Sequence, residues 1–176
     1  MTTWLLAPSG RASHRPRWSP GAGIGRRLGA LLELCPDDGP VADVGSGHGR
    51  LALALKRRNP RRRVLATELR SGPAAELRRL LGPDTGIPVL EGDGLSPLAG
   101  WACRGVVIAG IGGNGIRAIL EREPVLARGL DWLCLQPAQR PEPLRVWLAA
   151  QGWDVTVQRL VGERRHCYPT LLVHPR

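Results

Sequence analysis

Short apolar runs alternate with amphipathic stretches along most of this chain. Several of the runs end in glycine or an acidic residue, which is typical of buried strands in a parallel sheet. The stretches between them repeat leucine and alanine at helical intervals, which indicates helices with one apolar face. We predict strands at residues 41–44, 63–67, 87–90, 105–109, 132–135, 153–160 and 168–173, and helices at residues 26–34, 51–58, 74–81, 114–121 and 144–150.

Strands and helices that alternate in this way favour a mainly parallel sheet with helices on both faces. The last two predicted strands are separated only by a short polar link around residues 163–166, so we expect them to form an antiparallel hairpin. The pattern therefore predicts a Rossmann-like α/β fold with a seven-stranded sheet. We place this domain at residues 24–176.

Residues 1–23 show no hydrophobic period and are rich in proline, glycine, serine and arginine. Such a composition is typical of chain that does not pack into a core. We expect a flexible basic arm here, which is either a tail that contacts phosphate groups or an extension without such a role.

The formal net charge is +10, and Lys56 is the only lysine. Arginine has a planar fork of donors that suits phosphate, so this surface favours RNA as a partner. Coding bias or a simple need for solubility explains the same composition. The arginine runs at residues 57–58, 61–63 and 78–79 are either a track for phosphate groups or solvated helix ends.

The four cysteines are widely spaced and form no C-x-x-C pair. We therefore expect reduced thiols, buried at Cys134 and Cys167, and neither a disulfide framework nor a metal site. No apolar run approaches the roughly 20 residues that a membrane span needs, and the opening apolar run is too short for a signal peptide. We expect a cytoplasmic protein without a membrane partner.

A glycine-rich segment, Asp43-Val44-Gly45-Ser46-Gly47-His48-Gly49, joins the first predicted strand to the next helix. Glycines allow a tight turn and the close approach of a ligand, at the sheet edge where α/β proteins bind ligands. A carboxylate before the glycines opposes a diphosphate but suits the cationic, amino-bearing end of S-adenosylmethionine (SAM). The alternatives are a tight structural turn or an NAD-type site, and the acid and the closing hairpin argue against the latter.

Two further acids follow the next two strands. Glu68 lies 25 positions after Asp43, close to the offset of about 20 residues at which dinucleotide folds place a ribose-binding carboxylate. Asp93, beside Gly94, is placed to accept a hydrogen bond from the adenine amine of the cofactor. Either acid alone is more often a solvated loop carboxylate, but three acids at consecutive strand ends together favour SAM. The predicted cofactor-binding residues are Asp43, Gly45, Ser46, Gly47, His48, Glu68, Asp93, Gly94, Ala109 and Gly110.

The fourth predicted strand ends in Ala109-Gly110-Ile111-Gly112-Gly113-Asn114. Glycines here leave an open floor where a methyl group would meet its acceptor. We therefore assign Gly112, Gly113 and Asn114 to the catalytic site. Asn114 is also a candidate N-cap of the following helix.

These segments resemble the bacterial tRNA adenine-N1-methyltransferases of the TrmK type, class I enzymes that modify adenine 22 of tRNA. The matching segments, in unbroken order, are Arg27-Leu28, 41–46 with His48, Glu68 with Gly72-Pro73, 92–95, 108–110, 112–113, 135–137, 144–145 with 147–148, 152–153 and Tyr168. The resemblance implies a SAM-dependent enzyme with ribose contact at Glu68, adenine contact at Asp93 and the acceptor base near residues 110–114.

The chain departs from the family pattern at several positions. Gly47 stands where the family usually has aspartate, Gly49-Arg50 where it has alanine and tyrosine, and Ile111 where it has methionine. The family commonly carries a helical C-terminal extension, whereas this sequence stops at Arg176. We therefore expect RNA contact to come from the arginine-rich arm and surface; the alternative is that tRNA is not the substrate.

The expected reaction is direct transfer to adenine N1, whose in-plane lone pair needs no prior deprotonation. Alignment supplies most of the catalysis, and acceptors such as the Asn114 oxygen or main-chain carbonyls stabilise the charge on the base. A base in folded RNA must first leave its stack in the RNA. It would then pack against His48, Trp101 or Tyr168. The alternatives are a methyltransferase for small molecules or proteins and a non-catalytic module that binds SAM or RNA.

Overall fold

The sheet is built around five parallel strands, each a short and mostly apolar run, and the central ones are buried on both faces. The computed structural model describes residues 24–163 and 166–175, so the predicted arm at residues 1–23 lies outside the described residues. The parallel strands are β1 (Val41–Val44), β2 (Val64–Glu68), β3 (Val89–Glu91), β4 (Gly105–Ala109) and β5 (Trp132–Gln136).

Two longer antiparallel strands complete the sheet, β6 (Asp154–Glu163) and β7 (His166–His174). The strand order is β3-β2-β1-β4-β5-β7-β6, so β7 lies between β5 and β6. Leu135 of β5 pairs with Leu171 of β7, and the hairpin therefore extends beyond the carboxyl end of β5. The predicted Rossmann-like sheet with a closing hairpin is confirmed.

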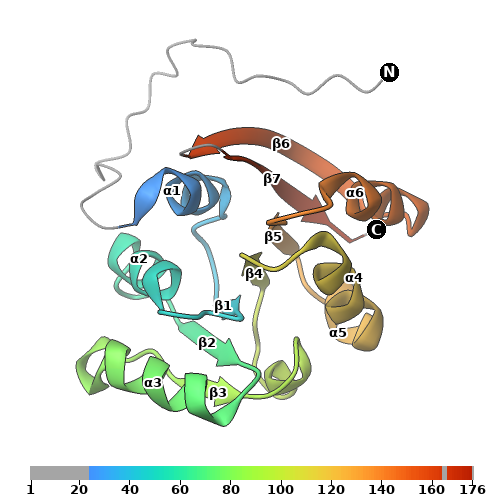
Figure 1. Cartoon of the computed structure of the whole chain (residues 1–176). Coiled ribbons are helices and arrows are strands. Elements are labelled where there is room, and N and C mark those ends of the chain that lie inside the picture. The colour runs from blue at the N-terminus through green and yellow to red at the C-terminus, as the bar shows by residue number, and fades with distance from the viewer. Residues whose placement is uncertain (1–23, 164–165, 176) are drawn as a thin grey trace.

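Helices cover both faces of this sheet (Figure 1). On one face lie α1 (Gly25–Leu34), α2 (Arg50–Arg58) and α3 (Ser71–Leu81), whose leucines pack against alternate residues of the strands. On the other face lie α4 (Gly113–Arg122), α5 (Pro124–Arg128) and α6 (Pro141–Ala150). None of the helices in the described part of the chain has the length and apolar composition that crossing a bilayer requires.

The structure adds three short elements to the predicted ones: α5 and two 3₁₀ helices, η1 (Pro83–Thr85) and η2 (Ser96–Leu98). Each begins with or contains a proline in its first turn, where the missing N–H has no helical partner to lose. Such single turns carry too few residues to show a period, so the apolar pattern does not reveal them.

The cysteine prediction was wrong at one position. Cys134 is buried, but Cys167 is exposed, because it lies on the part of β7 that pairs only with β6. Cys35 and Cys103 are free as well, with Cys35 buried.

Two of the arginines in the runs considered as a phosphate track or as solvated helix ends serve the fold instead. Arg62 is 4% exposed, and it donates to the carbonyl oxygens of Gly39 (2.8 Å) and Asp38 (3.2 Å). Arg58 donates to the carbonyl oxygens of Leu32 and Cys35. Arg62 ties the loop before β2 to the loop before β1, and Arg58, the last residue of α2, ties that helix to the end of α1. They are therefore unavailable for RNA.

Candidate active site

The glycine-rich loop after β1 forms the base of the site. Gly45, Gly47 and Gly49 have φ values of +69°, +56° and +71°, a region that other residues rarely adopt. Gly49 is also packed tightly, since a Cβ there would lie 2.8 Å from Leu77 and 2.7 Å from Leu81. By contrast, nothing lies within 4 Å of a Cβ at Gly47. Gly49 therefore fixes the loop against α3, and Gly47 leaves its surface open.

Asp43 lies beneath this loop and is 3% exposed. Its Oδ2 accepts hydrogen bonds from the Ser46 hydroxyl (2.6 Å) and the Ala52 amide (3.1 Å). Burial raises the pKa of Asp43 to about 6, with a smaller contribution from the negative charge of Glu68, and the two hydrogen bonds act in the opposite direction. The fold thus holds a carboxylate where its charge is poorly solvated, an arrangement common at functional sites.

Glu68, at the end of β2, reaches back to the same loop. Its Oε1 accepts a hydrogen bond from the Gly47 amide at 2.6 Å, and its Oε2 accepts one from the Leu69 amide at 3.3 Å. Glu68 therefore holds the exposed tip of the glycine loop in place.

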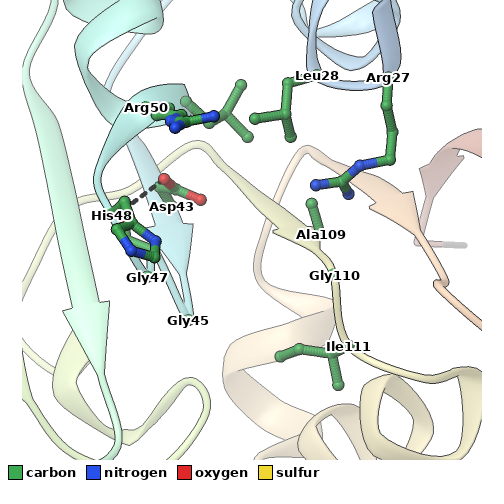
Figure 2. A pocket seen from close by; sticks show the side chains of 12 residues that line it. Arg27, Leu28, Asp43, Gly45, Gly47, His48, Arg50, Ala109, Gly110 and Ile111 are labelled. Carbon is green, nitrogen blue, oxygen red and sulfur yellow. Dashed lines mark hydrogen bonds between the residues drawn. The ribbon is translucent and has the colours of Figure 1, made fainter. Parts of the chain in front are cut away.

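A cavity of about 400 Å³ opens beside the loop at the carboxyl edge of the sheet, and we call it the first cavity. It is lined by Arg27, Leu28, Asp43, Gly45, Ser46, Gly47, His48, Arg50, Leu51, Ala109, Gly110 and Ile111. Figure 2 shows that the Arg27 guanidinium extends from α1 toward the side of the cavity that holds Asp43, above Ala109. The cavity therefore carries a cation and an anion on opposing walls.

Most of the predicted cofactor residues meet in this cavity. Asp43, Gly45, Ser46, Gly47, His48, Ala109 and Gly110 line it, whereas Glu68, Asp93 and Gly94 do not. Asp93 forms an ion pair with Arg122 of α4. Gly94 has a φ of +56°, and a Cβ there would lie 3.0 Å from Ile119, so it allows the loop after β3 to pack on α4.

The start of α4 differs from the prediction. The N-cap of α4 is Gly112, and Asn114 is the second residue of the helix and is exposed. The expectation that Asn114 caps the helix was therefore wrong. Asn114 is not among the residues that line the first cavity.

Gly113 is required for packing between two loops. A Cβ at this position would lie 2.2 Å from the Arg140 carbonyl oxygen. The Gly113 amide donates to Gln139 O (2.8 Å), and the Ala138 amide donates to Ile111 O (3.0 Å). These contacts join the loop after β4 to the loop after β5, and they set the floor of the site.

Sequence reasoning missed the contribution of α1 and α2 to this site. Arg27 and Arg50 had no assigned role, although Arg27-Leu28 is one of the segments that resemble TrmK. Arg27 is positioned by distant parts of the chain: its Nη1 donates to Gln136 Oε1 at 3.0 Å, and its amide donates to Glu163 Oε1 at 3.2 Å. A match to a family segment was the one signal available, since neither contact is local.

The family follows from a comparison with known proteins. Residues 24–171 match the model of a family described as a methyltransferase domain. The chain belongs to this methyltransferase family. The match covers every element from α1 into β7, including both walls of the first cavity.

Named relatives of this methyltransferase include RNA-modifying enzymes. It is 28% identical over 152 residues to the tRNA (adenine(22)-N(1))-methyltransferase of Bacillus subtilis, over 85% of this chain and 64% of that protein. It is 30% identical over 158 residues to a protein of Mycoplasma pneumoniae assigned as a tRNA methyltransferase, over 84% of this chain and 70% of that one. The chain thus spans about two thirds of the length of these relatives.

Solved structures agree with this result. The crystal structure of B. subtilis TrmK has a TM-score of 0.79 and 26% identity to this methyltransferase, over 88% of this chain and 67% of that chain. A Streptococcus pneumoniae protein assigned as a tRNA (m1A22) methyltransferase, in complex with SAM, has a TM-score of 0.81 and 27% identity, over 87% and 73%. The predicted resemblance to the TrmK type is confirmed.

Proposed function

We propose that this methyltransferase binds SAM with the amino-acid end in the first cavity and transfers the methyl group to N1 of an adenine in tRNA, in the cytoplasm. The observation that carries the proposal is the opposition of Arg27 and Asp43 across a cavity beside the glycine-rich loop. The assigned activities of the relatives support the same substrate.

The charges of the first cavity fit the two charged groups of an amino acid. Asp43 has one carboxylate oxygen, Oδ2, engaged by Ser46 and Ala52, which leaves Oδ1 for an α-ammonium group. Arg27 uses Nη1 for Gln136 and has further N–H groups for an α-carboxylate. A diphosphate would meet the Asp43 carboxylate, so the donor set favours SAM over a dinucleotide.

The nucleoside part of the cofactor would extend along the sheet edge toward β2 and β3. Glu68 is placed for the ribose hydroxyls and Asp93, with Gly94, for the adenine amine, as the sequence predicts. Both carboxylates have protein partners that hold them at this edge. We retain both as proposed cofactor contacts.

Bound here, SAM supplies a methyl group on a positively charged sulfur. Asp43 and Arg27 would hold its amino-acid end. The methyl group would pass to the lone pair of adenine N1 while the electron pair of the carbon–sulfur bond stays on sulfur, so that the positive charge would move to the base without prior removal of a proton. The chain's contribution is to align the reactants above Ala109 and Gly110 and to exclude water. Catalytic roles for Gly112, Gly113 and Asn114 stay predictions.

Calorimetry with SAM and its demethylated product, S-adenosylhomocysteine, tests the cofactor proposal. We expect both to bind wild-type protein, and Arg27→Gln to bind them about tenfold or more weakly, because a charged hydrogen bond is lost. Arg26→Gln is the matched control, since Arg26 is exposed and its side chain has no hydrogen bond or ion pair among the described residues. Equal affinities for the two variants would refute the assignment of Arg27.

Transfer of labelled methyl groups to unmodified tRNA, followed by mass spectrometry of the nucleosides, tests the reaction. We expect 1-methyladenosine. Turnover with small molecules or proteins in place of RNA would instead support another class I substrate. Tight cofactor binding without any transfer would make the chain a non-catalytic binding module.

A further inference from the structure

A second cavity, of about 720 Å³, adjoins the first. The two share Arg27, Leu28 and Arg50 as lining residues. The second cavity is completed by Ile24, Gly25, Glu163, His166 and Tyr168. These residues belong to the start of α1 and to the part of the β6–β7 hairpin that extends beyond β5. Its volume is within the range of about 300 to 1,000 Å³ that is usual for small-ligand sites.

The lining combines aromatic rings with positive charge. Tyr168 and His166 have ring centroids 6.2 Å apart at an interplanar angle of 52°. The Arg27 guanidinium carbon lies 5.3 Å from the centroid of the Tyr168 ring. The Glu163 carboxylate opposes an anion in this cavity, but it is engaged by the Arg27 amide and lies 4.0 Å from Arg27 Nε.

Arg50 is the cation in this cavity that the fold leaves available. It is exposed at the first position of α2, and no hydrogen bond or ion pair engages its side chain among the described residues. Arg58, at the other end of the same helix, is instead fully occupied by backbone carbonyls and Asp37. A free guanidinium that lines the same cavity as aromatic rings suits a ligand with a phosphate group and a flat ring.

We propose that the second cavity receives the acceptor nucleotide of the RNA. Its base stacks on Tyr168 with His166 alongside, its phosphate contacts Arg50, and its reactive edge points past Leu28 into the first cavity. The inference rests on the proposed function, because it places the RNA substrate of that reaction. It moves the acceptor from the start of α4, where Asn114 lies outside the lining of both cavities, to the side of the hairpin.

Tyr168 gives the most selective test because it lines the second cavity and not the first. With full-length protein and unmodified tRNA, we expect Tyr168→Leu to lower kcat/KM by about 5- to 100-fold, since base–aromatic stacking is lost. Tyr168→Phe keeps the ring and should restore kcat/KM to within about threefold of wild type. Calorimetric affinity for S-adenosylhomocysteine should stay within about twofold in both variants, because no cofactor contact changes.

Arg50→Gln and Arg57→Gln form a matched pair for the phosphate contact. Both arginines are exposed on α2, seven residues apart on nearly the same side of the helix, and both substitutions change the net charge equally. We expect kcat/KM to fall about tenfold for Arg50→Gln and to stay unchanged for Arg57→Gln. An equal fall in both would indicate a general effect of charge and would overturn the contact.

Failure of this inference is distinct from failure of the proposed function. If wild-type protein methylates tRNA and Tyr168→Leu does so with unchanged kcat/KM, the second cavity is not the acceptor site. If wild-type protein binds the cofactor but methylates no RNA, the proposed reaction itself is wrong. If Tyr168→Leu loses cofactor affinity and activity in parallel, Tyr168 serves the cofactor side, and the acceptor assignment is overturned.

Discussion

Arg27 and Gln136, 109 positions apart, form a reciprocal pair of hydrogen bonds. Arg27 Nη1 donates to Gln136 Oε1 at 3.0 Å, and Gln136 Nε2 donates to the Arg27 carbonyl oxygen at 2.9 Å. Gln136 is fully buried and also donates to Thr170 Oγ1 at 2.7 Å. This amide therefore links α1, β5 and β7, and it fixes the guanidinium that both cavities share.

Removal of the Gln136 amide should release Arg27. We expect Gln136→Leu to lower the free energy of unfolding by about 1–3 kcal/mol, because buried partners lose their hydrogen bonds. Cofactor affinity should fall as well, since Arg27 is no longer held. Urea unfolding and calorimetry measure the two effects. Gln139→Leu is the control, because Gln139 is exposed; a similar loss in that variant would contradict a specific role for Gln136.

Asp43 should make stability depend on pH. Its pKa of about 6 is above the value of 3.8 for a free aspartate, so the native state binds the proton more tightly. The resulting stabilisation is complete below about pH 4 and is lost as pH rises through 6, by about 3 kcal/mol in all. Asp43→Asn should therefore gain stability relative to wild type between pH 4 and 7.

The same substitution should act in the opposite direction on the cofactor. At pH 7.5, Asp43→Asn should bind SAM more weakly than wild type, because the carboxylate that faces the ammonium group is gone. Near pH 5, where the wild-type carboxyl of the free protein is largely protonated, the two affinities should converge. Unfolding curves and calorimetry at several pH values measure both effects. A stability difference that is constant from pH 4 to 8 would contradict the shifted pKa.

Variants of Asp93 and Arg122 can distinguish two roles of Asp93, the predicted contact with adenine and the surface ion pair with Arg122. Asp93→Asn should weaken SAM binding by about 3- to 10-fold, since a charged acceptor is lost. Arg122→Gln removes the partner but keeps the acceptor, so SAM affinity should stay within about twofold. Each change should alter stability by less than about 1 kcal/mol, as is usual for exposed pairs. Equal affinities for SAM in both variants would indicate that Asp93 serves only the ion pair.

Arg62 should matter for folding rather than for RNA. Arg62→Met removes two hydrogen bonds to carbonyl oxygens and the contact with the Trp132 ring, whose centroid is 5.7 Å away. We expect the free energy of unfolding to fall by about 2–4 kcal/mol, because carbonyl groups around a buried guanidinium lose their donors. Arg61→Met, at the exposed neighbouring position, should change it by less than about 0.5 kcal/mol. Urea unfolding of both variants checks this difference.

The sequence pattern predicts most of the fold because the central parallel strands are short and buried on both faces. The bounds of β1 and β4 agree with the predicted ones, and each predicted helix is present with small shifts at its ends. The helix ends moved because the first turns of α3 and α6 carry polar residues and proline instead of an apolar period. The apolar pattern of a helix does not show on which side of the sheet the helix packs, because this side follows from the topology of the chain.

The site was predicted in part, for a physical reason. The residues that follow strands can be found locally, and seven of the ten predicted cofactor-binding residues line the first cavity. Arg27 and Arg50 line it from α1 and α2, and Tyr168 lines the adjoining second cavity from β7. The contacts that position Arg27 span much of the chain. Arginine content alone was a misleading guide to the RNA-binding surface, because Arg58 and Arg62 donate hydrogen bonds to backbone carbonyl oxygens.

The position of β7 has a consequence for synthesis on the ribosome. β6 is translated first, yet among the described strands it pairs only with β7, so it has no neighbour to join until residues 166–174 have emerged. The glycine-rich loop is held by β1, β2, α2 and α3, which are all translated early. A nascent chain can therefore form the base of the cofactor site well before the wall that contains Tyr168 exists.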